Sequence, residues 1–145
     1  MKANKKYFGW VLGLFTAVIM STGVTWSADG DPDVNQKVRD ASAIAKLKEM
    51  KDVSLLYVKG MTCKSCAIGI RVKLSKLKFV NTKRYRRGVE MDIKTQLLTL
   101  ALKPGQKPDS NLIAKSVVDA GYVPVEWYTM ESGKIKAHPY PKQKK

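Results

Sequence analysis

Cys63 and Cys66 are the two cysteines of the chain, and two residues separate them in segment 60–66, GMTCKSC. Thiolates at this spacing can bind one soft metal ion between them, or cycle between dithiol and disulfide. A purely structural disulfide is a poor explanation, because closing so short a loop removes little entropy from the unfolded chain. A tetrahedral zinc site would be two ligands short, since the segment holds no Asp, Glu or His and the single histidine is His138. The spacing therefore favours two-coordinate Cu(I) or Hg(II), or thiol redox chemistry.

The cysteine pair is predicted to lie between a strand and a helix. Residues 53–59 form an apolar run that predicts a strand. Intervals of three, four and three then separate Ala67, Ile70, Leu74 and Leu77, which predicts one apolar stripe of a helix. The positive end of that helix would favour the thiolate form of a nearby cysteine.

The rest of the chain predicts a hairpin, a second helix and a last strand. Apolar and polar residues alternate over 89–93 and again over 98–102, as in two paired strands. Asp109 or Ser110 then caps a helix, and a short strand follows at 123–128. The proline in that strand favours an edge position or the strand's first residues.

An additional amphipathic helix is predicted ahead of these elements, over residues 33–50. Its apolar residues recur at helical spacing at Val34, Val38, Ala41 and Ala45. The helix would serve as a lid or spacer that packs on the domain, or as a dimer contact. The complete order predicts the α+β class, with a ferredoxin-like βαββαβ arrangement and an extra N-terminal helix.

The first 28 residues have the pattern of a secretory signal peptide. Three lysines precede residues 7–26, which carry no charge. A segment of that length can also span a bilayer, so a retained N-terminal anchor is the alternative. Either interpretation predicts a periplasmic or otherwise extracytoplasmic location. The predicted organisation is a signal peptide or anchor at 1–28, a linker and amphipathic helix at 29–52, the main domain at 53–130 and a basic flexible tail at 131–145.

The formal net charge is +15, and removal of residues 1–28 would take away three of the 27 Lys and Arg residues and no acidic residue. Such a charge favours acidic partners or an anionic membrane surface. The export signal argues against nucleic acid as the partner. Segment 83–87 concentrates the charge in Lys83, Arg84, Arg86 and Arg87. These residues form either a solvated loop or a docking site for an acidic partner or the membrane.

The motif GMTCKSC at 60–66, with VEMD at 89–92 and AGY at 120–122, resembles the heavy-metal-associated domain family. This family includes copper chaperones and periplasmic mercury-binding proteins. The resemblance covers residues 53–128. The passage from residue 77 to residue 89 is longer and more basic than is usual in the family.

The resemblance implies that Cys63 and Cys66 ligate one soft ion, with Cu(I) as the first expectation and Hg(II) as the second. The ion would pass by ligand exchange to a metal-transporting membrane protein or another thiolate carrier, and no catalysed reaction is expected. Met61 would anchor the loop as an apolar residue, in preference to acting as a thioether ligand. Thr62 would form hydrogen bonds within the loop. Tyr122 would shield the sulfurs, or would be an ordinary core tyrosine.

Two other functions fit parts of the sequence. A periplasmic thiol–disulfide oxidoreductase would also use a Cys-x-x-Cys pair at a helix start. The residues that precede the pair and the two strands between the helices argue against it. A metal-sensing accessory module of a membrane partner would use the same metal site, and the sequence does not separate it from a carrier.

Overall fold

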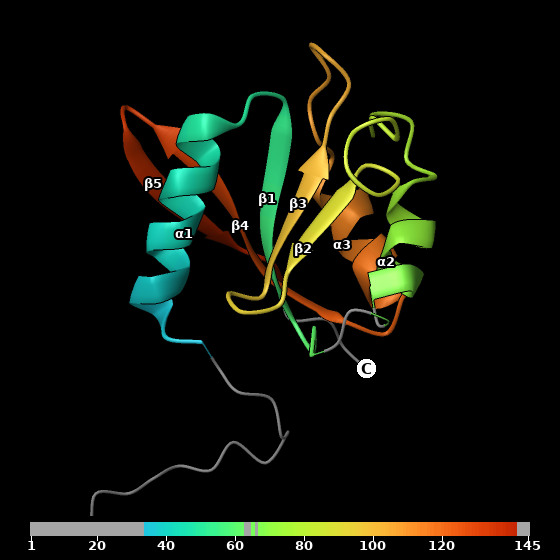
Figure 1. Cartoon of the computed structure of the whole chain (residues 1–145), viewed down its shortest axis with the longest axis horizontal. Helices are drawn as coiled ribbons and strands as arrows, with labels where there is room; N and C mark the ends of the chain where they lie inside the picture. Colours follow the sequence, from blue (N-terminus) through green and yellow to red (C-terminus); the bar gives the residue numbers. More distant parts are fainter. Residues whose placement is uncertain (1–33, 63–64, 66, 142–145) are drawn as a thin grey trace, which may run out of the picture.

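The structure, a computed structural model, describes residues 34–62, 65 and 67–141. The predictions for residues 1–33 lie outside this range. The described residues form three helices and five strands of an α+β fold (Figure 1). The elements are α1 (Gln36–Glu49), β1 (Val53–Lys59), α2 (Ala67–Leu74), β2 (Val89–Asp92), β3 (Leu97–Ala101), α3 (Ser110–Val118), β4 (Val123–Glu131) and β5 (Lys134–Pro139).

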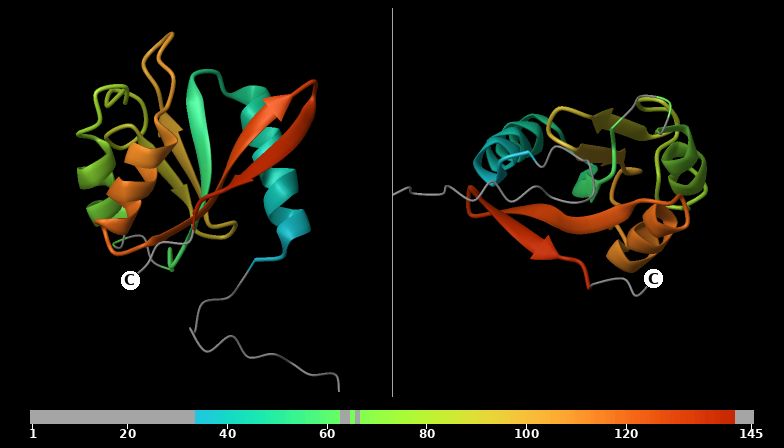
Figure 2. Two further views of the ribbon diagram at one scale, coloured as in Figure 1. Left: turned by 180° about the vertical axis from the view of Figure 1, so that it is seen from behind. Right: turned by 90° about the horizontal axis from the view of Figure 1, so that it is seen from below.

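The five strands form one antiparallel sheet in the order β2-β3-β1-β4-β5. Helix α1 covers one face of the sheet, and α2 and α3 cover the other (Figure 2). Strand β1 is buried between the two helix layers: Leu55 and Tyr57 pack with Ala43 of α1, whereas Leu56 and Val58 pack in the cluster that includes α2 and α3 residues. A central strand covered on both faces explains why its sequence is almost continuously apolar.

Helix α1 is present where the sequence predicts it, but its buried face was predicted wrongly. The buried residues are Arg39 and Ala43, whereas Val38 is 53% exposed. Arg39 can be buried because its guanidinium lies 3.6 Å from the centre of the Tyr57 ring and 3.8 Å from a carboxylate oxygen of Glu126. A long side chain with a planar charged group can cover apolar surface and still keep polar partners. The spacing of apolar residues alone therefore does not predict that an arginine is buried.

Strand β5 lies within the segment predicted to be a flexible tail, so that prediction was wrong for residues 134–139. This strand pairs antiparallel with β4 from Glu126 to Glu131, and Tyr140 beyond it is buried in the core. Strand β4 is therefore an interior strand. Its proline is tolerated because Pro124 pairs with Val58 of β1 only, before the pairing with β5 begins.

The basic segment 78–88 is held to the domain at several points. Phe79 and Val80 are buried, and Val80 forms an isolated bridge with Leu102. Gly88 has a φ of +81°, and its amide donates a hydrogen bond of 2.8 Å to the Arg84 carbonyl. The course of the loop is therefore fixed by packing and backbone hydrogen bonds at both of its ends.

Candidate metal centre

The predicted ligands Cys63 and Cys66 lie outside the described residues. The elements on either side of them are described: β1 ends at Lys59 and α2 begins at Ala67. Ser65 is exposed, and its carbonyl accepts a hydrogen bond of 3.1 Å from the amide of Ile68 in the first turn of α2. Segment 60–66 thus joins a central strand to a helix, and these two elements are the ones that the sequence predicts on either side of it.

Met61 is fully buried at the start of this connection. It belongs to the core cluster that also contains Leu56 and Val58 of β1 and Ile70 of α2. Gly60 precedes it with a φ of +94°, a left-handed conformation that glycine adopts without strain. This turn sends the next side chain into the core, so Met61 has the burial that an apolar anchor requires.

Thr62 is exposed, and its amide donates a hydrogen bond of 3.1 Å to the Gly60 carbonyl. The hydrogen bond that Thr62 makes within the loop is thus formed by its backbone amide. The chain therefore turns back on itself immediately before the first cysteine position.

Tyr122 lies beside the same turn because of the pairing between β1 and β4. Lys59 pairs with Val123, which places Tyr122 next to Gly60 at the end of the ladder. Tyr122 is half-buried against the core cluster that contains Met61. Burial raises the pKa of its phenol above the usual value.

The structure separates the four basic residues of segment 83–87. Arg84 donates a hydrogen bond of 2.9 Å from Nη1 to the Lys51 carbonyl, and its Nη2 lies 3.2 Å from the Tyr85 hydroxyl. That hydroxyl in turn lies 3.3 Å from the Met50 sulfur. Arg84 and Tyr85 thus tie the loop to the connection between α1 and β1.

Lys83, Arg86 and Arg87 have exposed side chains. Arg86 and Arg87 line a hollow of about 280 Å³ together with Ile68 and Arg71 of α2. The predicted docking group is therefore divided, with Arg84 in a structural role and Arg86 and Arg87 beside α2.

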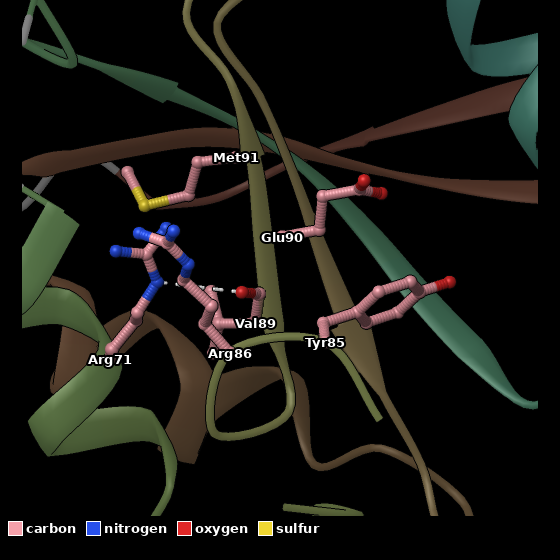
Figure 3. A pocket seen from close by; sticks show the side chains of 6 residues that line it. All are labelled: Arg71, Tyr85, Arg86, Val89, Glu90 and Met91. Atoms are coloured by element: carbon pink, nitrogen blue, oxygen red, sulfur yellow. Dashed lines mark hydrogen bonds between the residues drawn. The ribbon is translucent and has the colours of Figure 1, made fainter. Parts of the chain in front are cut away.

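Arg71 was not among the site residues that the sequence indicated. It lines a second hollow, of about 260 Å³, with Arg86 and residues of β2 (Figure 3). Its Nε donates a long hydrogen bond of 3.5 Å to the Val89 carbonyl. Partial burial, followed by repulsion from the Arg86 charge, lowers the pKa of Arg71. Arg71 and Arg86 meet only because of the path of loop 78–88, and no sequence pattern encodes that meeting.

Within residues 34–62, 65 and 67–141, no three His, Cys, Asp or Glu side chains are grouped closely enough to hold a metal ion. Over the same residues, no helix is long and apolar enough to cross a bilayer. A scan against protein-family models and searches of curated proteins and of solved structures found no match for the chain.

Proposed function

We propose that this chain is an exported carrier of one soft metal ion, Cu(I) or Hg(II), which Cys63 and Cys66 bind and release to a partner. In this proposal residues 53–130 are a heavy-metal-associated domain of ferredoxin-like βαββαβ topology, extended by α1 in front and by β5 behind. The carrier works outside the cytoplasmic membrane.

The observation that supports the proposal best is the pairing of Lys59 with Val123. This pairing brings together the end of β1, the buried anchor Met61 and the half-buried ring of Tyr122. A thiolate pair that begins two residues after Met61 would thus start close to an anchored strand end with an aromatic ring beside it. Rigid supports of this kind hold ligands at a fixed separation.

Two thiolates suit the proposed cargo chemically. Soft sulfur ligands select Cu(I) and other thiophilic ions over Ca²⁺ or Mg²⁺. An ion with only two ligands is open to attack by a thiolate of a partner protein. Transfer would then proceed through a shared intermediate, in which one incoming sulfur bonds to the ion before one of the two cysteines leaves. A metal-transporting membrane protein or another thiolate carrier would be the partner.

A competition titration tests the proposal. The reduced full chain in an uncharged detergent is titrated anaerobically with Cu(I) against a chromophoric chelator, and then with Hg(II). We expect one ion per chain, with binding lost in Cys63→Ser and in Cys66→Ser. Ser65→Ala is the matched control, because it changes a polar residue between the cysteines without removing a thiol, and it should bind as the unmodified chain does.

Failure of the reduced chain to bind either ion would reject the carrier. The oxidoreductase would then become the leading function, and catalytic reduction of insulin disulfides by the chain would support it. A carrier should show no such catalysis.

A further inference from the structure

Two arginine side chains from different elements converge on one side of β2. Arg71 comes from α2 and Arg86 from the loop that precedes β2, and both residues line the same two hollows. Their guanidinium groups lie together near Met91 and the Val89 carbonyl (Figure 3). Arg87 adds a third positive charge to the hollow beside α2.

No carboxylate balances this pair within the part of the chain that the structure describes. Glu90 lines the same hollow, but its side chain points away from the arginines in Figure 3, and its Oε2 lies 3.8 Å from Nζ of Lys46. None of the ion pairs among the described residues includes Arg71 or Arg86. Two like charges therefore stand side by side, and partial burial of Arg71 weakens the screening by water.

The backbone around Arg86 is held in an uncommon conformation. Tyr85 and Arg87, on either side of it, have φ values of 53° and 56°, a left-handed region that non-glycine residues seldom adopt. Surrounding contacts must maintain such a conformation, and it recurs at ligand-binding segments. Arg86 lies between these two residues and lines the same hollow as Arg71.

We infer that Arg71 and Arg86 form a binding site for a phosphate-type oxyanion, either free or carried by a lipid head group. Each guanidinium group is planar and offers several N–H donors, which match the oxygens of phosphate. A bound dianion would remove the repulsion between the two arginines. The site is independent of the cysteine pair, so it stands or falls separately from metal binding.

An amide NMR titration of the full chain in uncharged detergent tests the site, with inorganic phosphate as the probe. We expect saturable shifts of the Val89 and Met91 amides. The double variant Arg71→Gln with Arg86→Gln should weaken binding by about tenfold or more. The matched control, Lys103→Gln with Lys107→Gln, removes the same charge from exposed positions and should bind as the unmodified chain does.

A conservative pair, Arg71→Lys with Arg86→Lys, keeps the charge but loses the planar donors. It should bind phosphate more weakly than the unmodified chain. If the glutamine pair does not fold, this lysine pair tests the site in its place, and unchanged affinity would overturn it. Absence of saturable shifts, or equal weakening in the glutamine pair and its control, would overturn the site. A parallel titration with dihexanoyl phosphatidic acid identifies the source: tighter binding than phosphate, absent for dihexanoyl phosphatidylcholine, indicates a lipid head group, and equal affinity indicates the free anion.

Discussion

The guanidinium carbon of Arg39 lies 3.6 Å from the centre of the Tyr57 ring, between helix α1 and the sheet. Arg39 is 4% exposed, and it donates hydrogen bonds of 3.1 Å to the Val34 carbonyl and 2.8 Å to Oε1 of Gln36. Its Nε also lies 3.8 Å from Glu126, which accepts a short hydrogen bond from the Tyr128 hydroxyl. One charged side chain thus joins α1 to two neighbouring strands.

Replacing Arg39 by alanine should lower the free energy of unfolding by about 3 kcal/mol, because it removes the stacking and leaves a largely buried carboxylate without its cation. Urea unfolding monitored by circular dichroism measures the loss. Arg39→Met with Glu126→Gln removes both charges and keeps most of the volume, so it should cost less than the single alanine change. Lys37→Ala, at an exposed position of the same helix, is the control. Equal stability of the two alanine variants would show that the stacked arginine contributes nothing.

Gly88 and Gly105 offer a matched pair for the loop that carries the basic residues. Both have positive φ, 81° and 72°, so alanine at either costs about 1 kcal/mol from backbone strain. At Gly88 a Cβ would also lie 2.5 Å from Cγ1 of Val80 and 2.9 Å from the Asn81 carbonyl oxygen, whereas at Gly105 it would meet nothing within 4 Å. Gly88→Ala should therefore cost about 3 kcal/mol and Gly105→Ala about 1 kcal/mol. Thermal unfolding of both variants checks the difference, and similar losses would contradict the close packing at Gly88.

Tyr140 should respond oppositely to two substitutions. The residue is 8% exposed and packs in the core, but its hydroxyl is buried without a hydrogen-bond partner among the described residues. Tyr140→Ala should cost about 3–5 kcal/mol, whereas Tyr140→Phe should be neutral or stabilising by about 1 kcal/mol. A loss of 2 kcal/mol or more in the phenylalanine variant, roughly the cost of a good buried hydrogen bond, would show that the hydroxyl has a partner.

The pH dependence of stability gives an independent test of the same hydroxyl. Burial raises the pKa of Tyr140 above its usual value, so the folded state favours the neutral phenol. The unfolded chain loses this proton near pH 10 and the folded chain only at higher pH, so the stabilisation is complete below about pH 10 and is lost above it. Tyr140→Phe should therefore show a shallower fall in unfolding free energy above pH 10. An unchanged slope would contradict the role of Tyr140 and leave the effect to the other tyrosines with raised pKa values, Tyr122 and Tyr128.

Met61 separates packing from metal ligation. Met61→Leu should keep the unfolding free energy within about 1.5 kcal/mol, and Met61→Ala should lower it by about 3 kcal/mol, because the side chain is fully buried. In an anaerobic Cu(I) competition the leucine variant should retain the affinity of the unmodified chain. Loss of affinity without loss of stability would identify the thioether as a ligand and would contradict its role as an anchor.

Strong local patterns allowed much of the fold to be predicted. The apolar run at Val53–Lys59 gave the bounds of β1, and Asp109 caps α3 with hydrogen bonds to the amides of Asn111 and Leu112. Strand β5 was missed because alternating lysines give it the composition of a solvated tail, although it pairs along β4. An edge strand needs only one partner and little apolar surface, so its sequence signal is weak.

Tertiary contacts account for the rest of what the sequence did not reveal. Tyr122 lies near the end of β1 because Lys59 pairs with Val123 in the ladder between β1 and β4. From the sequence, only the resemblance to the heavy-metal-associated family indicated that Tyr122 lies beside segment 60–66. The convergence of Arg71 and Arg86 depends on the folded path of segment 78–88, and the burial of Arg39 depends on Tyr57 lying opposite it. Such arrangements have no periodic signature.

The placement of α1 has a mechanical consequence. This helix contacts β1, β4 and β5 from the face opposite α2 and α3 (Figure 2). A force applied to the chain ahead of residue 34 would load the interface between α1 and the sheet first, and the layer of α2 and α3 would bear it only through the sheet. The contacts of Arg39 with Tyr57 and Glu126 would therefore decide whether such a force detaches α1 before it reaches the rest of the sheet.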